Sequence, residues 1–550
     1  MATLSVRKWS WRDGSALAAL LLVSIVCLPI FLCMAPWVDA TFYDICARII
    51  QRDGVLYRDS FDTNLPGMAW LHLAIRSLFG WRSEVIRAAD FLVVAGITLL
   101  LVRWHPALPR HGRMWTAATL LFYYFSTSEW CQNQRDVWML LPCLAALYLR
   151  RRQLLASRPA FRILLLSVLE GLLWGAAVWI KPMAFVPALA CWLFGIVWRC
   201  PTTFARRSIM LEAAGLLTGG LLVGGAGSFW LWRTGAWTPF WDIMLNWDPE
   251  YQDYFMRWPL RWRHLKFWCV TSMPWCLVHL AALPLAGFAL AKATRRSETP
   301  IPERLTQGLL AILYFSWIAQ VLLFQGWYPY HLTPPVLLAL TLVMPRIRVT
   351  AAPAWRCALA FHALLFFGLA FVTHPGLRPQ RLARWWDCMT EGSTNRLKDQ
   401  LALTPQQGVS GGASDWGELE SIADFLRNQE LREDEPICLH ESTMPLYLKL
   451  NRAPPLRFLF YGQATGVYRA HRQQILAELS ASRPRYVVSD LAMVGFIQNY
   501  PPDEVDSVPE PPPHFPEPMA ESFPWSEPNV FCSGRYAVHQ VSKPIRKIWP

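Results

Sequence analysis

Long apolar runs recur along the first two-thirds of this 550-residue chain. A helix needs about 20 apolar residues to cross the hydrocarbon core of a bilayer, and several such helices have to pack together as a bundle. We therefore expect a mostly α-helical, polytopic transmembrane bundle of about eleven spans. The apolar runs lie near 15–35, 84–103, 113–128, 135–150, 161–180, 183–199, 208–232, 266–291, 306–325, 331–345 and 353–373.

Composition supports the membrane class and argues against a nucleic-acid partner. Hydrophobic residues make up 54% of the chain and charged residues only 17%, with a mean hydropathy of +0.23. Thirty tryptophans suit the aromatic belts at membrane interfaces. The formal charge of +13 comes largely from short arginine clusters between the apolar runs, which is the pattern of cytoplasmic loops.

These basic clusters also predict the orientation of the bundle. Arg7, Lys8 and Arg12 precede the first run, without a small-residue cleavage site, so we expect an uncleaved first helix and a cytoplasmic N-terminus. Alternate gaps carry the acids, prolines and aromatics and should face outside, although 233–265 is basic near its end. The predicted outer gaps are 36–83, 129–134, around 181, 233–265 and 326–330.

The last third of the chain reads as a soluble domain. We expect a transmembrane domain over 1–375, with a functional first outer loop at 36–83, and an extracytoplasmic α/β domain over 376–550. Helical spacing predicts helices at 415–429 and 469–481, and short apolar segments predict strands at 436–441, 486–491 and 536–540. The Pro- and Glu-rich segment 501–528 is typical of an extended linker.

Most of the thirteen cysteines fall inside apolar runs, where they act as small hydrophobic residues. Cys388, Cys438 and Cys532 lie in the last third, and one disulfide among them is compatible with the sequence. No CxxC pair occurs, so a zinc site is not indicated.

The first outer loop, WVDATFYDICARIIQRDGVLYRDSFDTNLPG (37–67), is unusually rich in acids and aromatics for a connection between two helices. Residues 40–52 have an amphipathic pattern that predicts a helix on the membrane surface, with Gly54 as its stop. A second surface helix should open after Asn64. Asp39 is either the N-cap of the first helix or a general base at the membrane interface.

Charged and aromatic residues near the outer ends of other spans are further candidates. Arg135 either binds a phosphate or snorkels to the interface, and the neighbouring Asp136 suits a helix N-terminus. Lys181 has no acid nearby in sequence, so it requires an anionic ligand or a distant partner unless it only ends a helix. The segment FQGWYPYHLTPP (324–335) carries either ligand-binding groups or part of an aromatic belt.

Together these features resemble the GT-C fold of membrane glycosyltransferases, the superfamily of the protein O-mannosyltransferases and the lipid A aminoarabinose transferases. The likeness covers about residues 15–375. It rests on VDATFYD after the first run, GVLYRDSFDTNLPG, the QRD of the second outer gap, the Lys-Pro at 181–182 and the late YHLTPP.

The resemblance implies a polyprenyl-phosphate sugar as donor, a glycan, lipid or protein hydroxyl as acceptor, and inversion at the anomeric carbon. Asp39 would be the catalytic base, and Arg135, Lys181 and His331 would bind the donor phosphate. Many relatives have Asp-Glu at the base position, whereas Ala40 follows Asp39 here, so a second acid would come from Asp44, Glu129 or Asp136. A divalent metal is left open. The implied substrate contacts are Tyr57, Arg58, Asp59, Asn64, Gln325 and Tyr330.

Two other classes of protein remain as alternatives. A secondary transporter would also be polytopic, but it typically shows internal repeats and broken helices at the midplane, and we find no repeat between the halves of this chain. A non-catalytic lipid-binding protein would have no need of the dense first loop and would tolerate the loss of Asp39.

Overall fold

The computed structural model describes most of the chain and divides it into two compact units. The first unit comprises residues up to Leu32, Arg87–Gly227 and Trp258–Met389, and the second comprises Cys33–Ile86, Ser228–Arg257 and the residues from Thr390 onward. The described residues are 9–105, 108–156, 159–199, 205–295, 300–346, 353–402, 414–433, 435–459, 464, 466–482, 484–491 and 523–542.

Each predicted apolar run lies on a helix, and one run is divided between two. Residues 266–291 fall on α12 and α13, which the Met273-Pro274 segment separates. The helices are α1 (Trp11–Cys33), α4 (Ser83–Arg103), α5 (Arg110–Ser126), α6 (Arg135–Leu155), α7 (Ala160–Ile180), α8 (Phe185–Arg199), α9 (Ala205–Arg233), α12 (Trp258–Thr271), α13 (Val278–Thr294), α14 (Ile301–Phe324), α15 (Thr333–Val343) and α16 (Pro353–Thr373).

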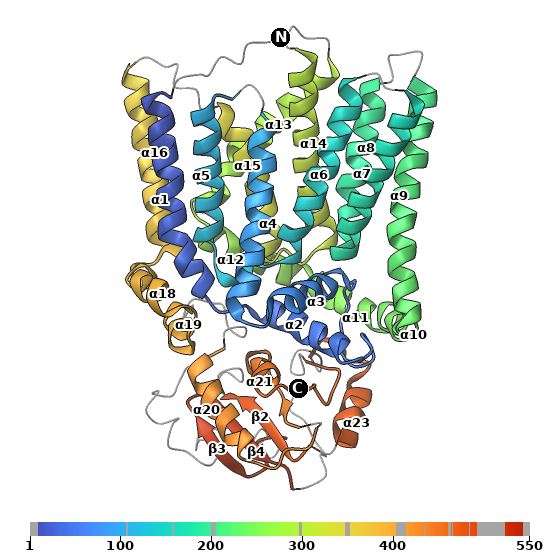
Figure 1. Cartoon of the computed structure of the whole chain (residues 1–550), viewed down its shortest axis with the longest axis vertical. Helices are drawn as coiled ribbons and strands as arrows, with labels where there is room; N and C mark the ends of the chain where they lie inside the picture. The colour runs from blue at the N-terminus through green and yellow to red at the C-terminus, as the bar shows by residue number, and fades with distance from the viewer. Residues whose placement is uncertain are drawn as a thin grey trace. The chain divides into compact units, whose positions relative to one another are not determined.

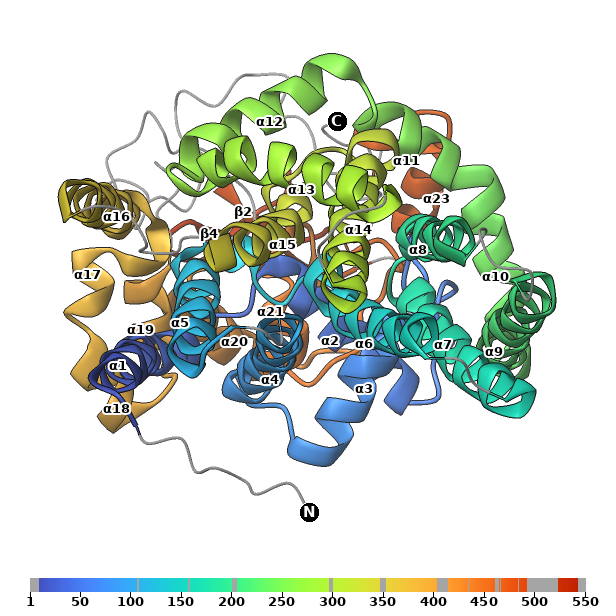
Figure 2. The same cartoon turned by 90° about the horizontal axis from the view of Figure 1, so that it is seen from above.

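Seven segments of the described ranges are long and apolar enough to cross a membrane: α1, α4, α7, α9 and α14, together with Pro182–Arg199, which contains α8, and Trp275–Thr294, which contains α13. The other four predicted runs lie on α5, α6, α15 and α16. The helices run side by side (Figure 1), and α15 packs against α5, α6 and α14, which are seen end on in Figure 2. The chain is therefore a multi-pass integral membrane protein.

Helices α7 and α9 pack unusually closely because glycines line their contact. A Cβ added at Gly171 would meet the Leu216 backbone oxygen at 2.3 Å, and one at Gly219 would meet the Val168 backbone oxygen at 2.2 Å. Small residues allow such close approach between membrane helices, where packing replaces the hydrophobic effect as the force of association.

A buried network of charges joins α6, α7 and α9. The Arg150 guanidinium donates to Glu170 at 3.0 Å and to Glu212 at 2.8 Å, and Gln153 donates to Glu170 at 3.0 Å. All four side chains are at most 2% exposed. Ionisable groups inside a membrane bundle are costly unless they pair, so this network fixes how the three helices meet.

The second unit holds a four-stranded sheet of order β1-β2-β4-β3. Its strands are β1 (Ile437–Cys438), β2 (Tyr486–Asp490), β3 (Asn529–Ser533) and β4 (Tyr536–Gln540), with β1 and β2 parallel and the other pairs antiparallel. The three predicted strands are present, and β3 is an addition. Of the predicted linker, only 523–528 lies within the described residues. Cys438 in β1 carries a free thiol, so it forms no disulfide.

Helix α20 (Trp416–Arg427) packs on β3 and β4 and buries the predicted face, which includes Leu419, Ile422 and Leu426. The predicted helix at 469–481 corresponds to α23 (Arg472–Ser482). The other α-helices that lie wholly in this unit are α2 (Val38–Gln51), α3 (Gly67–Phe79), α10 (Trp237–Asp242), α11 (Asp248–Phe255), α19 (Asn395–Leu401) and α21 (Pro445–Lys449).

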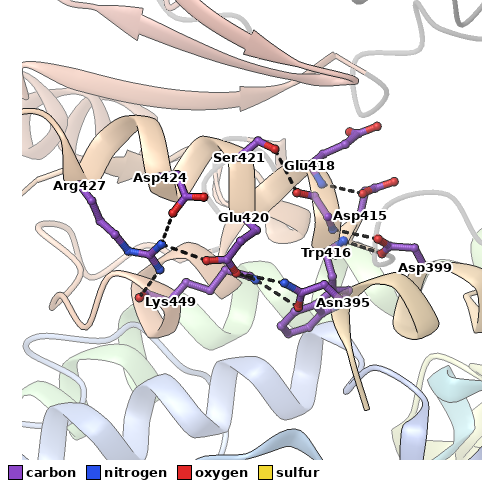
Figure 3. A network of polar contacts seen from close by, with 11 residues as sticks. Asn395, Asp399, Asp415, Trp416, Glu418, Glu420, Ser421, Asp424, Arg427 and Lys449 are labelled. Atoms are coloured by element: carbon purple, nitrogen blue, oxygen red, sulfur yellow. Dashed lines mark hydrogen bonds and ion pairs between the residues drawn. The ribbon is translucent and has the colours of Figure 1, made fainter. Parts of the chain in front are cut away.

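A polar network holds α19, α20 and α21 together (Figure 3). Asp415 caps α20 by accepting from the Glu418 N–H at 2.9 Å, and Asp399 of α19 accepts from the Gly417 N–H at 2.8 Å. Lys449 at the end of α21 pairs with Glu420. Burial alone would raise the pKa of Glu420, but Lys449 and the other donors outweigh it and lower that pKa to about 2.

The close contact between α7 and α9 predicts a sharp difference between two neighbouring glycines. The Cβ of Gly219→Ala would clash with the backbone of α7 at Val168 and Leu172, so it pushes the two helices apart. The Cβ of Gly220→Ala enters open space. We expect the first variant to lose about 1–3 kcal/mol of stability, as overpacking does, and the second to melt like the wild type. Thermal melting in detergent measures both, and equal melting temperatures would contradict the close packing.

Candidate functional site

In the first unit, a buried polar cluster forms around Lys181. The Nζ atom of Lys181 lies 2.7 and 2.9 Å from the two carboxylate oxygens of Asp136 and 3.1 Å from Oε1 of Gln325. Lys181 is 5% exposed and Asp136 is fully buried. Lys181 thus has the distant partner that the sequence requires, across 45 residues of chain.

Local structure explains why these side chains meet. Lys181 precedes Pro182, which disfavours helical geometry at the residue before it, so α7 ends at Ile180 and Lys181 is extended. Asp136 occupies the first turn of α6, where the helix dipole favours a carboxylate. Gln325 follows the last residue of α14 and also donates to Gln320.

An aromatic and histidine wall adjoins this cluster. The Tyr330 ring centroid lies 6.0 Å from Nζ of Lys181, and Tyr330 stacks on Tyr328 and meets His331 edge to face. The Tyr328 N–H donates to Nδ1 of His331 at 3.2 Å. Lys181 and Arg135 both lie near enough to His331 to act on it electrostatically.

The predicted donor-binding residues Arg135, Lys181 and His331 therefore lie together, with Gln325 and Tyr330 beside them. Asp136 pairs with Lys181, and Lys181 and Arg135 both lie near His331. The arrangement suits an anion, because a guanidinium and an ammonium can both donate to phosphate oxygens.

Glu129, the other acid of this region, lies elsewhere in the first unit. It forms a buried ion pair with Arg381, which belongs to α17 (Pro379–Leu382). The pair holds the short helix η1 (Glu129–Cys131) to the segment that follows α16.

In the second unit, Asp39 lies in the first turn of α2 and is half-buried. The N-cap position belongs to Trp37, whose side chain makes no capping hydrogen bond. The N-cap interpretation of Asp39 is therefore wrong, because the helix begins two residues earlier than the pattern at 40–52 indicates. Nine residues of α2 are buried, so protein rather than lipid covers much of its surface.

A second acid lies near Asp39 that the sequence did not reveal. Glu441 opens the short helix η9 (Glu441–Thr443), and burial raises its pKa to about 7, with further contributions from Asp490 and Asp39. Nothing in the local sequence LHESTM marks Glu441 as functional, since only folding brings it near the first loop.

Asp44 joins α2 to α3. It accepts from Nε of Arg76 at 2.7 Å and lies 2.8 Å from Nδ1 of His72, and all three side chains are buried. Burial would raise the pKa of Asp44, but Arg76 and His72 outweigh it, so its pKa is lowered. Asp44 is an ionised structural link at neutral pH.

The other predicted residues of the first loop shape the loop itself. The Tyr57 hydroxyl donates to the Asn64 backbone oxygen at 2.7 Å, and the Tyr57 ring packs against Phe240. Asp59 accepts from the Val55 N–H at 2.7 Å and pairs with Arg58 at 2.7 Å. Over the described residues, no three His, Cys, Asp or Glu side chains gather closely enough to hold a metal ion.

The fold is the GT-C fold, as the likeness to one solved structure shows. The chain is similar to ArnT from Cupriavidus metallidurans, a structure described as bound to undecaprenyl phosphate, with 14% identity, a TM-score of 0.53, and coverage of 97% of this chain and 98% of that one. It also matches the oligosaccharyltransferase AglB from Archaeoglobus fulgidus at 11% identity and a TM-score of 0.45, over 88% of this chain and 70% of that one. No protein-family model and no curated protein matches the sequence.

The raised pKa of Glu441 predicts a pH-dependent difference between wild type and Glu441→Gln. In the unfolded chain Glu441 ionises near its ordinary value of 4.5, while in the folded protein it keeps its proton up to about pH 7. Wild type therefore loses stability relative to the glutamine variant as pH rises from about 4.5 to about 7, and the loss is complete above that range.

Melting temperatures of both proteins across this pH range measure the effect. In an Asp39→Asn background the upper end of the range should move to lower pH, because one neighbouring negative charge is removed. A difference between wild type and Glu441→Gln that is independent of pH would contradict a raised pKa at Glu441.

Proposed function

We propose that this protein is a membrane glycosyltransferase that moves a sugar from a polyprenyl-phosphate donor to a hydroxyl group of a protein, lipid or cell-envelope glycan. The observation that supports it most is the buried Lys181–Asp136–Gln325 cluster, with Arg135 and His331 nearby, in a bundle of the GT-C fold. The solved relative ArnT is described as bound to undecaprenyl phosphate, which is a ligand of the proposed class.

In this proposal Lys181, Arg135 and His331 bind the donor phosphate. Asp136 holds the ammonium of Lys181 in position, and Gln325 accepts a further hydrogen bond from it. As the bond to the sugar breaks, the phosphate gains negative charge, and fixed cations stabilise that charge without having to reorganise.

Asp39 is the proposed catalytic base. It accepts the proton of the acceptor hydroxyl while that oxygen attacks the anomeric carbon, and the bond between this carbon and the phosphate oxygen breaks. The electron pair leaves with the phosphate, so no second acid has to protonate the leaving group, and the anomeric configuration inverts.

Many relatives have a second acid beside the catalytic base, and we assign this role to Glu441, as a residue that positions Asp39. Asp44, Glu129 and Asp136 each already face a cation in the structure. Glu441 instead lies near Asp39, and its raised pKa makes it a protonated hydrogen-bond donor below about pH 7.

The proposed site faces outward. The basic clusters between the apolar runs predict a cytoplasmic N-terminus and an extracytoplasmic α/β domain over 376–550, following a transmembrane domain over 1–375. Labelling of single cysteines introduced near each terminus, in intact cells and in permeabilised cells, tests this orientation.

Asp39→Asn should abolish turnover while leaving donor binding intact. General-base catalysis contributes about 10²–10⁴-fold, so we expect a loss of kcat in that range. The measurement offers purified protein a panel of polyprenyl-phosphate sugars with acceptor hydroxyls and follows loss of the intact donor by mass spectrometry. Asp53→Asn, an exposed acid of the same loop, is the matched control.

Equal turnover in Asp39→Asn and wild type would remove Asp39 from the mechanism. Wild-type protein that binds no donor of the panel would contradict the transferase itself. Movement of an intact solute across proteoliposomes, without cleavage of any donor, would favour the transporter alternative.

Lys181→Gln should weaken donor binding rather than remove the base. Hydrogen bonds to charged groups contribute about 1.5–3 kcal/mol, so KM for the donor should rise by roughly tenfold or more. Lys181→Arg keeps the charge opposite Asp136 and should recover part of the affinity. The exposed Lys266→Gln is the control. An unchanged KM in a variant that melts normally would contradict the phosphate role.

A further inference from the structure

A cleft of about 800 Å³ lies wholly within the second unit. One side is formed by the last turns of α2 and the loop at 54–59, and the other by the loop at 452–457 and the end of α23. Its volume is in the range of small-molecule sites. None of the residues assigned to the donor phosphate or to the base lines it.

The cleft has a strong excess of positive charge. Five arginines and two acids line it: Arg48, Arg52, Arg58, Arg452, Arg457, Asp59 and Glu478. Arg58 pairs with Asp59 and Arg457 pairs with Glu478, each at 2.7 Å. Within each pair the two charges cancel, so the net positive charge of the cleft comes from the other three arginines.

Arg48, Arg52 and Arg452 bond to neutral oxygens. Arg48 donates to Oδ1 of Asn451, and Arg52 donates to the same oxygen at 2.8 Å and to the Asn451 backbone oxygen at 3.0 Å. Arg452 donates to the Arg432 backbone oxygen at 3.4 Å. Within the described ranges, no carboxylate lies in ion-pair distance of these three guanidinium groups.

The fold holds the first two guanidinium groups close together at some cost. Asn451 has a left-handed backbone, with φ of +54°, which asparagine tolerates better than most residues. Its single carboxamide oxygen accepts from both arginines. Burial and the like charge of Arg52 lower the pKa of Arg48, and the more distant Asp44 offsets this only in part.

The remaining walls of the cleft are apolar. They are formed by Ile45, Ile49, Leu448, Pro454, Pro455 and Leu456. A ligand with both an anionic group and an apolar part would therefore match this surface. Guanidinium forks match the oxygens of phosphate in pairs, and three of them suit a phosphate better than a single carboxylate.

We propose that this cleft is a phosphate-binding site, in which Arg48, Arg52 and Arg452 hold the phosphate group of a small ligand and the proline-rich wall contacts its apolar part. The site goes beyond the proposed transfer reaction, because neither Asp39 nor Lys181 lines the cleft. The phosphate belongs either to a lipid headgroup or to a soluble compound, which share this chemistry.

The experiment compares two forms of phosphate on the full-length protein. Inorganic phosphate is titrated into detergent-purified protein at low ionic strength by calorimetry, and phosphatidate is offered in phosphatidylcholine nanodiscs. The test variant is Arg52→Gln/Arg452→Gln. The charge-matched control is Arg82→Gln/Arg396→Gln, two exposed arginines of the same unit that pair with Glu84 and Glu391.

We expect wild type to bind at least one form, the test variant to bind about tenfold more weakly or worse, and the control to bind like wild type. Binding of inorganic phosphate would show that a soluble phosphate occupies the site without a lipid. Binding of phosphatidate alone would show that the site takes a lipid headgroup. No binding of either form, or equal binding by wild type and the test variant, would overturn the proposal.

A second measurement covers the case in which the test variant fails to fold. Phenylglyoxal modifies accessible arginines of the wild-type protein, and mass spectrometry reports which ones. Bound phosphate should protect Arg48, Arg52 and Arg452 and leave Arg82 and Arg396 unprotected. Unchanged modification of the three cleft arginines at saturating phosphate, with and without phosphatidate, would overturn the proposal as well. The Lys181→Gln variant should show the same protection, which separates this site from the proposed donor site.

Discussion

The contact between Lys181 and Asp136 fixes the arrangement of the first unit more than any apolar contact does. Apolar contacts in a membrane bundle gain little from the hydrophobic effect, since lipid and protein are similarly apolar. Separating a buried ammonium from its carboxylate leaves an uncompensated charge, at a cost of about 3–5 kcal/mol. With Gln325 as third member, the contact brings the ends of α6, α7 and α14 to one place.

Two carboxyl groups of the second unit, Asp44 and Glu441, have pKa values shifted in opposite directions by their surroundings. Asp44 faces Arg76 and His72 and remains ionised at neutral pH, so it serves as a structural link between α2 and α3. Glu441 is half-buried near other acids, and its pKa reaches about 7. Two acids of similar intrinsic chemistry thus differ in charge near neutral pH, which is the usual way in which a protein separates acid and base roles.

The sequence predicts the helices and most of the sheet because those depend on local pattern. The apolar runs, the buried face of α20 and the Pro that ends α7 are all visible within a few residues of chain. Lys181 even signals its need for a partner. The identity of that partner is not visible, since Asp136 reads equally well as a helix N-terminal acid. Glu441 and the strand β3 carry no local signal, because their roles arise only from contacts across the fold.

The arginines of the second unit fall into two groups: some form ion pairs with acids, and others donate hydrogen bonds only to neutral oxygens. Arg76 meets Asp44 and Arg457 meets Glu478, and in each case burial of the cation is offset inside the protein. Arg48 and Arg52 share one neutral amide oxygen, which accepts hydrogen bonds from both but forms an ion pair with neither. An arrangement that served stability alone would place an acid at Asn451. A neutral residue there leaves the positive field of the cleft available to an anion from outside the chain.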